Sequence, residues 1–170
     1  MNDAFVSVGS NIDAAINIPL ALRRLKNLVN VRTTSTFYRT EDVQCSDRPK
    51  FSNGVWHILV EHNPFELKRD ILRKVEADLG RNRAADRYSP RTIDLDLILY
   101  GDRVIHTENL TLPDPNIRTR SFIAVPLLEL APDLLLPDTG SPLSALQSAH
   151  DRSLHVLGDL TETLQEIIKM

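Results

Sequence analysis

The sequence is short of cysteine, of aromatic residues and of long apolar runs, and each shortage excludes a class of protein. Cys45 is the one cysteine in 170 residues, so no disulfide can form within the chain, and no metal-ligand pattern surrounds it. No apolar run approaches the roughly 18 residues of a membrane-spanning helix, and the chain does not open on a basic-then-apolar signal segment. The five histidines have no zinc-binding spacing. We therefore expect a reducing, cytoplasmic location and no membrane partner.

The charge balance also narrows the choice of partners. The formal net charge is −3 and the aromatic content is 5%. A mildly acidic chain with few aromatic rings lacks the basic surface and the stacking residues of a general nucleic-acid binder, so we expect no nucleic-acid partner. The 42% hydrophobic and 25% charged content is ordinary for a soluble globular protein of one domain. The oligomeric state stays open, with a monomer as the simplest expectation.

Residues 87–101 hold the most informative pattern in the chain. Alternating apolar residues predict one buried face of a strand, formed by Ile93, Leu95, Leu97 and Leu99. Asp94 and Asp96 then share the other face, about 7 Å apart. Two adjacent carboxylates on an apolar strand repel each other unless a cation or strong donors neutralise them. Mg²⁺ is the natural candidate, because it binds carboxylate and phosphate oxygens.

The segment before this strand is rich in arginine. Within eleven residues that hold one acid, Asp86, stand four arginines: Arg81, Arg83, Arg87 and Arg91. A guanidinium group binds phosphate oxygens in a bidentate way. Each feature alone also fits a solvated surface. A carboxylate pair beside an arginine cluster, however, indicates phosphoryl transfer, which depends mainly on positioning and charge stabilisation.

Other stretches predict further strands. Alternation and β-branched residues favour a strand over Val31–Arg39, and Ala4–Val8 and Val55–Glu61 read as two more strands. Gly101 and Asp102 predict a hairpin turn from the acidic strand into residues 103–106. These strands, together with helices expected near Pro19, over residues 63–80 and from Ile123, indicate an α+β domain with a mainly antiparallel sheet.

Apolar spacing and capping residues predict the helices. One helix should start near Pro19, and a second should start at the Asn63-Pro64-Phe65-Glu66 capping box and end at Gly80. On this second helix Glu76 reads as an ordinary surface acid. A third should follow from Ile123 with Pro126 in its first turn. The tail over 150–170 has a helical apolar stripe that fits either packing on the domain of residues 1–149 or pairing with another chain.

The run from Ser89 to Ile98 resembles the signature of the 6-hydroxymethyl-7,8-dihydropterin pyrophosphokinases, enzymes of folate biosynthesis. Segments around Gly9, Tyr38 and Asn53 agree with the family in order and spacing, and the resemblance covers roughly residues 3–145. It implies a ferredoxin-like βαββαβ fold with C-terminal additions. It also implies transfer of pyrophosphate from ATP to 6-hydroxymethyl-7,8-dihydropterin, with release of AMP and with two Mg²⁺ ions bound alongside ATP.

The resemblance further implies roles for individual residues. Catalytic roles fall to Arg81, Arg91, Asp94 and Asp96, and the two acids also hold the metal. ATP binding falls to Glu76, Arg83, Arg87, Leu97, Thr111 and Arg120. Pterin binding falls to Thr40, Val43, Phe51, Asn53, Tyr88 and Phe122. The residue types alone fit a plainer interpretation, in which the phenylalanines belong to the core and the asparagine to a turn.

One departure and three alternatives accompany this interpretation. Asp114 stands where the family usually has a histidine that contacts the nucleotide, and an acid there would repel phosphates unless it is turned away or bound to metal. A non-catalytic pterin- or nucleotide-binding homologue would lack metal binding. An RNA-binding module would show salt-sensitive RNA binding. A Mg²⁺ nuclease would need a groove for a polymer.

Overall fold

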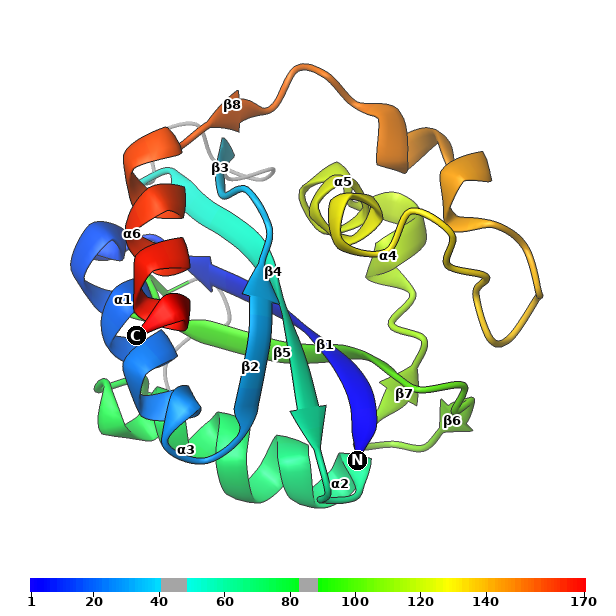
Figure 1. Ribbon diagram of the computed structural model, residues 1–170, viewed down its shortest axis with the longest axis horizontal. Helices are drawn as coiled ribbons and strands as arrows, with labels where there is room; N and C mark the ends of the chain where they lie inside the picture. The colour runs from blue at the N-terminus through cyan, green and yellow to red at the C-terminus, as the bar shows by residue number, and fades with distance from the viewer. Residues whose placement is uncertain (41–48, 83–88) are drawn as a thin grey trace.

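An antiparallel sheet runs through the middle of the molecule (Figure 1). The structure is a computed structural model, and it describes residues 1–40, 49–82 and 89–170. Within these ranges six strands form the sheet: β1 (Asn2–Ser10), β2 (Asn30–Thr34), β3 (Tyr38–Thr40), β4 (Phe51–Val60), β5 (Asp94–Tyr100) and β8 (His155–Val156). Their order is β5-β1-β4-β3-β8, and β2 pairs with β4 on the same side as β3.

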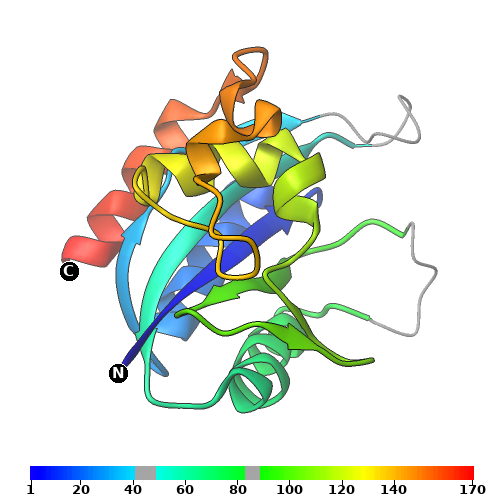
Figure 2. The same ribbon diagram turned by 90° about the vertical axis from the view of Figure 1, so that its right-hand side faces the viewer.

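Helices cover both faces of this sheet. One face carries α1 (Ala14–Lys26), the continuous helix made of α2 (Pro64–Glu66), η1 (Leu67–Leu72) and α3 (Arg73–Asp78), and α6 (Gly158–Lys169). The other face carries α4 (Asn116–Thr119), α5 (Ser121–Leu130) and η2 (Leu143–Ala145), with η3 (Gln147–His150) packed on α5. Figure 2 shows α4 and α5 in front of the sheet and α1 behind it. No helix in the described part of the chain is long and apolar enough to span a membrane.

The two faces hold two separate cores. Alternate residues of β1 supply them: Val6 and Val8 pack with the three helices of one face, whereas Phe5 packs beneath α5 with Val55 and Leu127. The order of elements along the chain, with β1 and β4 at the centre and β5 and β2 outside them, is the ferredoxin-like βαββαβ arrangement. The predicted α+β fold is therefore confirmed.

The acidic strand does not keep one apolar face along its whole length. Its pairing with β1 shifts register, so that Val6 lies opposite Leu97 but Phe5 lies opposite Leu99. Ile98 is the extra residue of this β-bulge, and the strand beyond a bulge turns its side chains to the other face. Leu97 accordingly lies in the helix-side core and Leu99 beneath α5. The prediction that Leu99 shares a face with Leu97 was wrong.

The strand predicted over 31–39 is broken into β2 and β3. The break occurs at Ser35, whose N–H donates to the carbonyl of Val55 at 2.9 Å while its hydroxyl accepts the N–H of Val55 at 2.9 Å. A side chain thus replaces a main-chain acceptor in the ladder, and the chain bends before β3. The next strand, β4, begins at Phe51, earlier than predicted, because its first residues pair with both β1 and β3.

Two prolines lie inside helices, although the sequence places them at helix starts. The first helix, α1, already begins at Ala14, so Pro19 falls within it, and Pro126 falls within α5. An interior proline removes one hydrogen bond and costs about 3 kcal/mol. Burial of Ile18 and Leu22 on one helix and of Leu127 on the other outweighs that cost.

The second predicted helix has the expected ends. The side chain of Asn63 accepts the N–H groups of Phe65 and Glu66 at 3.0 Å each, and Glu66 accepts the N–H of Asn63 at 3.2 Å. This is the predicted capping box. At the other end Gly80 has φ 79°, a left-handed conformation that glycine adopts without strain.

The remaining connections differ in part from the prediction. The turn at Gly101 does not return the chain onto β5, because β6 (Ile105–His106) pairs with β7 (Thr111–Leu112). The hairpin turn therefore lies between residues 107 and 110, where Thr107 and Leu110 exchange hydrogen bonds. The C-terminal helix α6 packs against α1 and β2 of the same chain.

Candidate active site

The two strand acids lie at the start of β5 on the face that carries α5. Asp94 is held by two guanidinium groups, since Nη1 of Arg81 and Nη1 of Arg91 each donate to one of its carboxylate oxygens. Asp96 is exposed, and within the described ranges no side chain or main-chain N–H donates a hydrogen bond to its carboxylate. The structure therefore brings the four residues predicted as catalytic into one cluster but gives the two acids different neighbours.

Glu76 completes this cluster from the helix side. Its side chain is 1% exposed, and Oε1 accepts Nη1 of Arg81 at 2.7 Å and the N–H of Leu95 at 2.8 Å. The interpretation as a surface acid was wrong, because Val75 and Glu76 are both buried where α3 meets the outer edge of β5. An edge strand leaves N–H groups unpaired, and this carboxylate accepts one of them. An acid beside a buried apolar residue, shortly before an arginine-rich segment, was the available signal.

Charge is unevenly distributed over the cluster. Burial lowers the pKa of Arg81, but the carboxylates of Asp94, Glu76 and Asp96 outweigh burial, so the pKa lies above its ordinary value. The environment of Asp96, by contrast, disfavours the charged form of its side chain. Although solvent reaches Asp96, the surrounding protein displaces part of its water. The negative charges of three neighbouring acids also repel its carboxylate: Asp94, Glu76 and Asp114. Together these effects raise the pKa of Asp96 to about 7.

Asp114 is the fourth acid of this region. Its N–H donates to the carbonyl of Ile98 at 2.9 Å, which ties the residue to β5, and its side chain accepts the N–H of Asn116 at 2.8 Å. Burial raises the pKa of Asp114, while the hydrogen bonds from Asn116 oppose the rise. The acid is thus turned toward its own loop, yet it still adds negative charge around Asp96.

The acids fit a bound cation only in part. Within the described ranges, no three His, Cys, Asp or Glu side chains are placed to hold a metal ion together. The carboxylate of Asp96 has no hydrogen-bond donor among the residues that the structure describes and lies in a negative environment, which suits Mg²⁺. Asp94 would share its oxygens with Arg81 and Arg91. The residues therefore suit Mg²⁺ that takes the rest of its oxygen ligands from water and phosphate.

A row of three residues joins the acid cluster to the predicted pterin residues. Gly9 of β1 lies opposite Asp94 of β5 on one side and opposite Asn53 of β4 on the other. Directly opposed residues of an antiparallel sheet point to the same face, so Asn53 and Asp94 face the same side about 10 Å apart. Ser7, the next residue of β1 on this face, is also small. Between the amide and the acid the sheet thus presents only small side chains.

Gly9 is fixed at this position by sterics. A Cβ at this residue would lie 2.7 Å from Oδ1 of Asn53 and 3.8 Å from the ring of Phe51. The amide of Asn53 in turn donates from Nδ2 to Oγ1 of Thr40 at 2.6 Å. Three residues predicted to bind the pterin therefore lie together around one glycine.

Asn11 anchors the arginine-rich segment to the end of β1. Its side-chain oxygen accepts the N–H of Arg91 at 2.6 Å, and its N–H donates to the carbonyl of Arg91 at 3.1 Å. The Gly-Ser-Asn run that resembles the family motif thus has two structural roles beyond that of a turn. Gly9 leaves space for the side chain of Asn53, and Asn11 positions Arg91, a predicted catalytic residue.

The other predicted site residues are more dispersed. Arg120 and Phe122 are half-buried where α5 begins, and Thr111 is half-buried in β7. The side chain of Leu97 is 4% exposed and packs in the helix-side core, on the face opposite the two acids, and its role in ATP binding stays a prediction. Four predicted residues lie outside the described ranges: Val43, Arg83, Arg87 and Tyr88.

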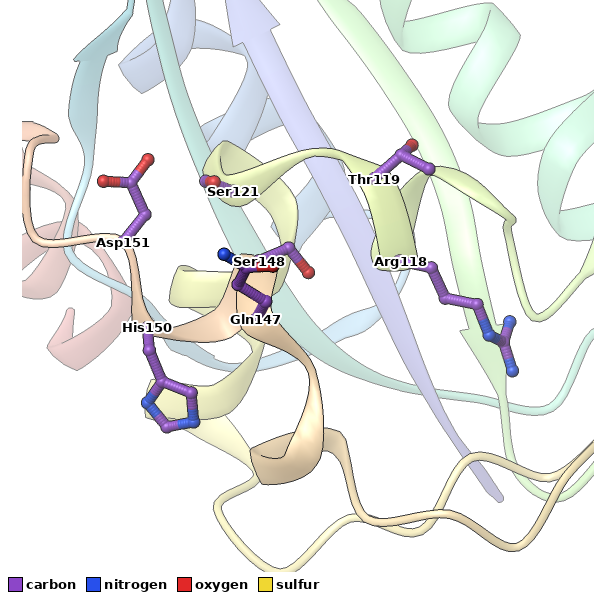
Figure 3. Close-up of a pocket in the computed structure, with 7 residues that line it drawn as sticks. All are labelled: Arg118, Thr119, Ser121, Gln147, Ser148, His150 and Asp151. Carbon is purple, nitrogen blue, oxygen red and sulfur yellow. The ribbon is translucent and has the colours of Figure 1, made fainter.

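A separate hollow lies between α5 and the segment that follows it (Figure 3). It is lined by Arg118, Thr119, Ser121, Gln147, Ser148, His150 and Asp151, none of which the sequence predicted. Arg118 points away from the others in Figure 3 and donates to Asp138 at 2.7 Å, while His150 bonds the carbonyl of Ser144 at 2.5 Å. Several of its polar groups are therefore already engaged by the protein itself.

Comparison with known proteins gives a consistent result. The family model described as 7,8-dihydro-6-hydroxymethylpterin-pyrophosphokinase (HPPK) matches residues 5–132. A protein of Haemophilus influenzae named 2-amino-4-hydroxy-6-hydroxymethyldihydropteridine pyrophosphokinase is 37% identical over 142 residues, which cover 82% of this chain and 88% of that protein. The protein of the same name from Bacillus subtilis is 36% identical over 132 residues, covering 76% of this chain and 78% of the relative.

Solved structures agree on the fold. A crystal structure of Plasmodium falciparum HPPK-DHPS with pteroate superposes with a TM-score of 0.65 at 13% identity, covering 85% of this chain and 43% of that one. The match of the family model to most of the chain, and relatives above 30% identity over most of their own length, settle the family. This chain belongs to the 7,8-dihydro-6-hydroxymethylpterin-pyrophosphokinase family.

Proposed function

We propose that this protein transfers pyrophosphate from ATP to the hydroxymethyl group of 6-hydroxymethyl-7,8-dihydropterin and releases AMP, a step of folate biosynthesis. The row Asn53–Gly9–Asp94 is the observation that carries the proposal. It puts an amide suited to a heterocycle edge and an acid suited to a metal–phosphate complex on one face, with small residues between them. A pterin and a triphosphate can therefore meet end to end above β1.

The acid and arginine cluster provides the phosphate side of the reaction. Asp94 and Asp96 would hold Mg²⁺, which when bound screens the triphosphate charge and orients it for in-line attack. We assign two such ions, each completing its ligands with phosphate oxygens and water. Arg81 and Arg91 stand beside Asp94 and stabilise the charge on the transferred group and on departing AMP. In the reaction the hydroxyl oxygen of the pterin bonds to the β-phosphorus and gives its proton to water, while the bond from that phosphorus to the α,β-bridging oxygen breaks and AMP leaves with that oxygen.

The amide side provides the pterin slot. Asn53 offers both a donor and an acceptor to the ring edge, and its hydrogen bond to Thr40 fixes which way the amide points. Phe51 and Phe122 stand at β4 and α5 and hold the flat ring by aromatic contact. Binding of the nucleotide then falls to Arg120 and Thr111. Glu76 contributes to it by holding Arg81 in place.

We infer further that residues 1–149 form the catalytic domain, that the tail over 150–170 is packed on it, and that the protein works as a monomer in the cytoplasm. The packing of α6 on α1 supports the second point.

The first experiment is a nucleotide assay. Purified protein is incubated with MgATP and 6-hydroxymethyl-7,8-dihydropterin, and AMP and ADP are separated chromatographically. AMP that forms only when both the pterin and Mg²⁺ are present is the expected result. ADP would mean transfer of a single phosphoryl group, and no turnover with retained pterin binding would mean a non-catalytic homologue.

Variants of the two acids test the residue roles. Asp94→Ala and Asp96→Ala should each reduce turnover by more than about 100-fold, because metal-bound charge stabilisation is worth several kcal/mol. Circular dichroism should show an intact fold. Asp78→Ala, which removes an exposed acid on α3, is the control and should keep wild-type turnover. Near-normal turnover in either strand variant would refute the metal assignment.

A further inference from the structure

The C-terminal segment joins the sheet beside the pterin slot. β8 pairs with β3, so that Val156 lies opposite Tyr38 and His155 opposite Arg39, and α6 then runs back along α1 (Figure 1). β3 has only three residues, and in the described structure its neighbours in the sheet are β4 and β8. A strand this short depends on both neighbours for its position.

Phe37, the residue before β3, is bound through its main chain to this segment. Its N–H donates to Oγ1 of Thr161 at 2.9 Å, and its carbonyl accepts the N–H of Leu157 at 2.8 Å. The hydroxyl of Thr161 donates in turn to the carbonyl of Leu157 at 2.8 Å. These three bonds close a ring in which both polar main-chain groups of Phe37 are satisfied by the C-terminal segment. Because Phe37 is fully buried and Thr161 is 7% exposed, water cannot readily replace the hydroxyl.

The side chain of Phe37 packs directly on β4. Its ring lies against Gly54, where an added Cβ would come within 2.4 Å of a ring carbon, and it packs at a tilt against Trp56 with ring centroids 6.5 Å apart. Gly54 directly follows Asn53. The ring of Phe37 therefore packs tightly against the backbone next to Asn53, whose amide is assigned to the pterin.

The position of β3 also determines the position of the Asn53 amide directly. Tyr38 lies opposite Asn53 and Thr40 lies opposite Phe51, and the hydroxyl of Thr40 accepts Nδ2 of Asn53 at 2.6 Å. This hydrogen bond fixes the amide orientation, and it can form only when β3 is in register. A path of direct contacts thus leads from α6 to the pterin slot.

We propose that Thr161 is a positioning residue for pterin binding, which acts by holding Phe37 and hence β3, Thr40 and the amide of Asn53. The inference rests on the proposed function only for the identity of the ligand. The C-terminal segment then supports the substrate site through its hydrogen bonds to Phe37 and its pairing with β3. Binding of ATP should be independent of it, because the acid and arginine cluster lies at β5, on the far side of β1 and β4.

The test compares Thr161→Val with Thr161→Ser. The valine keeps the shape but leaves the buried N–H of Phe37 without an acceptor, whereas the serine keeps the hydroxyl. We expect Thr161→Val to raise KM for the pterin by about fivefold or more, with KM for ATP unchanged, and Thr161→Ser to restore the wild-type value. Thr163→Val is the matched control, because Thr163 also donates to its own helix, at Asp159, but lies exposed.

The outcomes separate the two proposals. Absence of AMP from the wild-type protein refutes the proposed function, whereas AMP from wild type with an unchanged pterin KM in Thr161→Val refutes the positioning role. A lower melting temperature with equal effects on both substrates means that the residue serves stability alone, and that outcome also refutes the proposal.

A measurement on the wild-type protein covers the case in which Thr161→Val does not fold. If docking of the segment favours pterin binding, pterin binding must favour docking to the same degree. Amide hydrogen exchange at Phe37 and Leu157 should therefore slow when the pterin is added, while exchange at Thr107 in the turn between β6 and β7 stays unchanged. Equal exchange at Phe37 with and without the pterin would overturn the inference.

Discussion

At the scale of single residues, Asp94 and Asp96 show how one strand face can hold two different acids. Asp94 has two arginine donors, so its charge is neutralised within the protein. Asp96 has three acids around it and a pKa of about 7. The metal-free protein therefore carries an unbalanced negative charge at one point, which a bound cation would balance.

A pH dependence of stability follows for the metal-free protein. The pKa of Asp96 rises from 3.8 to about 7 on folding, so between these values the folded state binds more protons than the unfolded state. The stabilising effect of that proton is complete below pH 4 and is lost as the pH rises through 7. Denaturant unfolding in EDTA at pH 4 to 8 should thus show wild type losing stability relative to Asp96→Asn.

Mg²⁺ gives the control for this prediction. Added at pH 8, it should stabilise wild type by binding the folded state, and it should stabilise Asp96→Asn less. Parallel stability curves for the two proteins in EDTA would contradict the raised pKa of Asp96.

Gly9 gives a second residue-scale prediction. Gly9→Ala places a Cβ that would lie 2.7 Å from Oδ1 of Asn53, so the amide must move. Because misplacement by about 1 Å can cost 100-fold, we expect kcat/KM for the pterin to fall by about 10- to 100-fold. Gly158→Ala is the control, since nothing lies within 4 Å of the added Cβ there. Steady-state kinetics with normal pterin parameters for Gly9→Ala would show that Asn53 does not need its present position.

At the scale of elements, Glu76 connects α3 to the outer edge of β5. One buried oxygen accepts both a guanidinium group and a strand N–H. The helix, the strand and Arg81 therefore hold one another in place, and the phosphate side of the site depends on a residue that would not touch the reacting atoms.

Removal of this carboxylate should be strongly destabilising. Glu76→Ala removes one of the two carboxylates that pair with Arg81 and leaves the buried N–H of Leu95 without the acceptor it has in wild type, and we expect the free energy of unfolding to fall by about 3 kcal/mol. Asp78→Ala, on the same helix, removes an exposed pair with Arg24 and should cost less than about 1 kcal/mol. Urea titration of both variants checks the contrast, and equal losses would mean that burial of Glu76 contributes nothing.

At the scale of the whole molecule, the C-terminal helix shares a core with the central sheet and α1. Leu164 is fully buried and belongs to the same cluster as Val6 and Leu22. A shared core predicts that the tail and the sheet unfold together rather than as two units.

Leu164→Ala tests that cooperativity. The lost contacts and the cavity should lower the free energy of unfolding by about 3 kcal/mol, and the variant should still unfold in one transition. Circular dichroism, which reports α6, and fluorescence of Trp56 in the sheet should give coincident curves. A separate early loss of helical signal would show that α6 is an independent unit.

Much of the fold was predictable because local rules and burial agreed along the chain. The capping box at Asn63, the left-handed glycine at Gly80 and the strand β1 all lie where the sequence places them. Three of the failures share one cause, which is that a tertiary partner overrode the local pattern. The β1 register moved Leu99 across the sheet, a side-chain hydroxyl broke the second strand at Ser35, and the β5 edge drew Glu76 inward.

The sequence by itself determined the chemistry of this protein: a carboxylate pair, an arginine cluster and a family signature, all contained in one short run around Asp94. Only the tertiary structure decided how these groups are used. Strand pairing set Asn53 and Asp94 in one row across Gly9, and packing of α6 placed Thr161 where it binds Phe37, the residue before β3. The reason is that residue type fixes what a group can bind, whereas register and packing fix which groups meet.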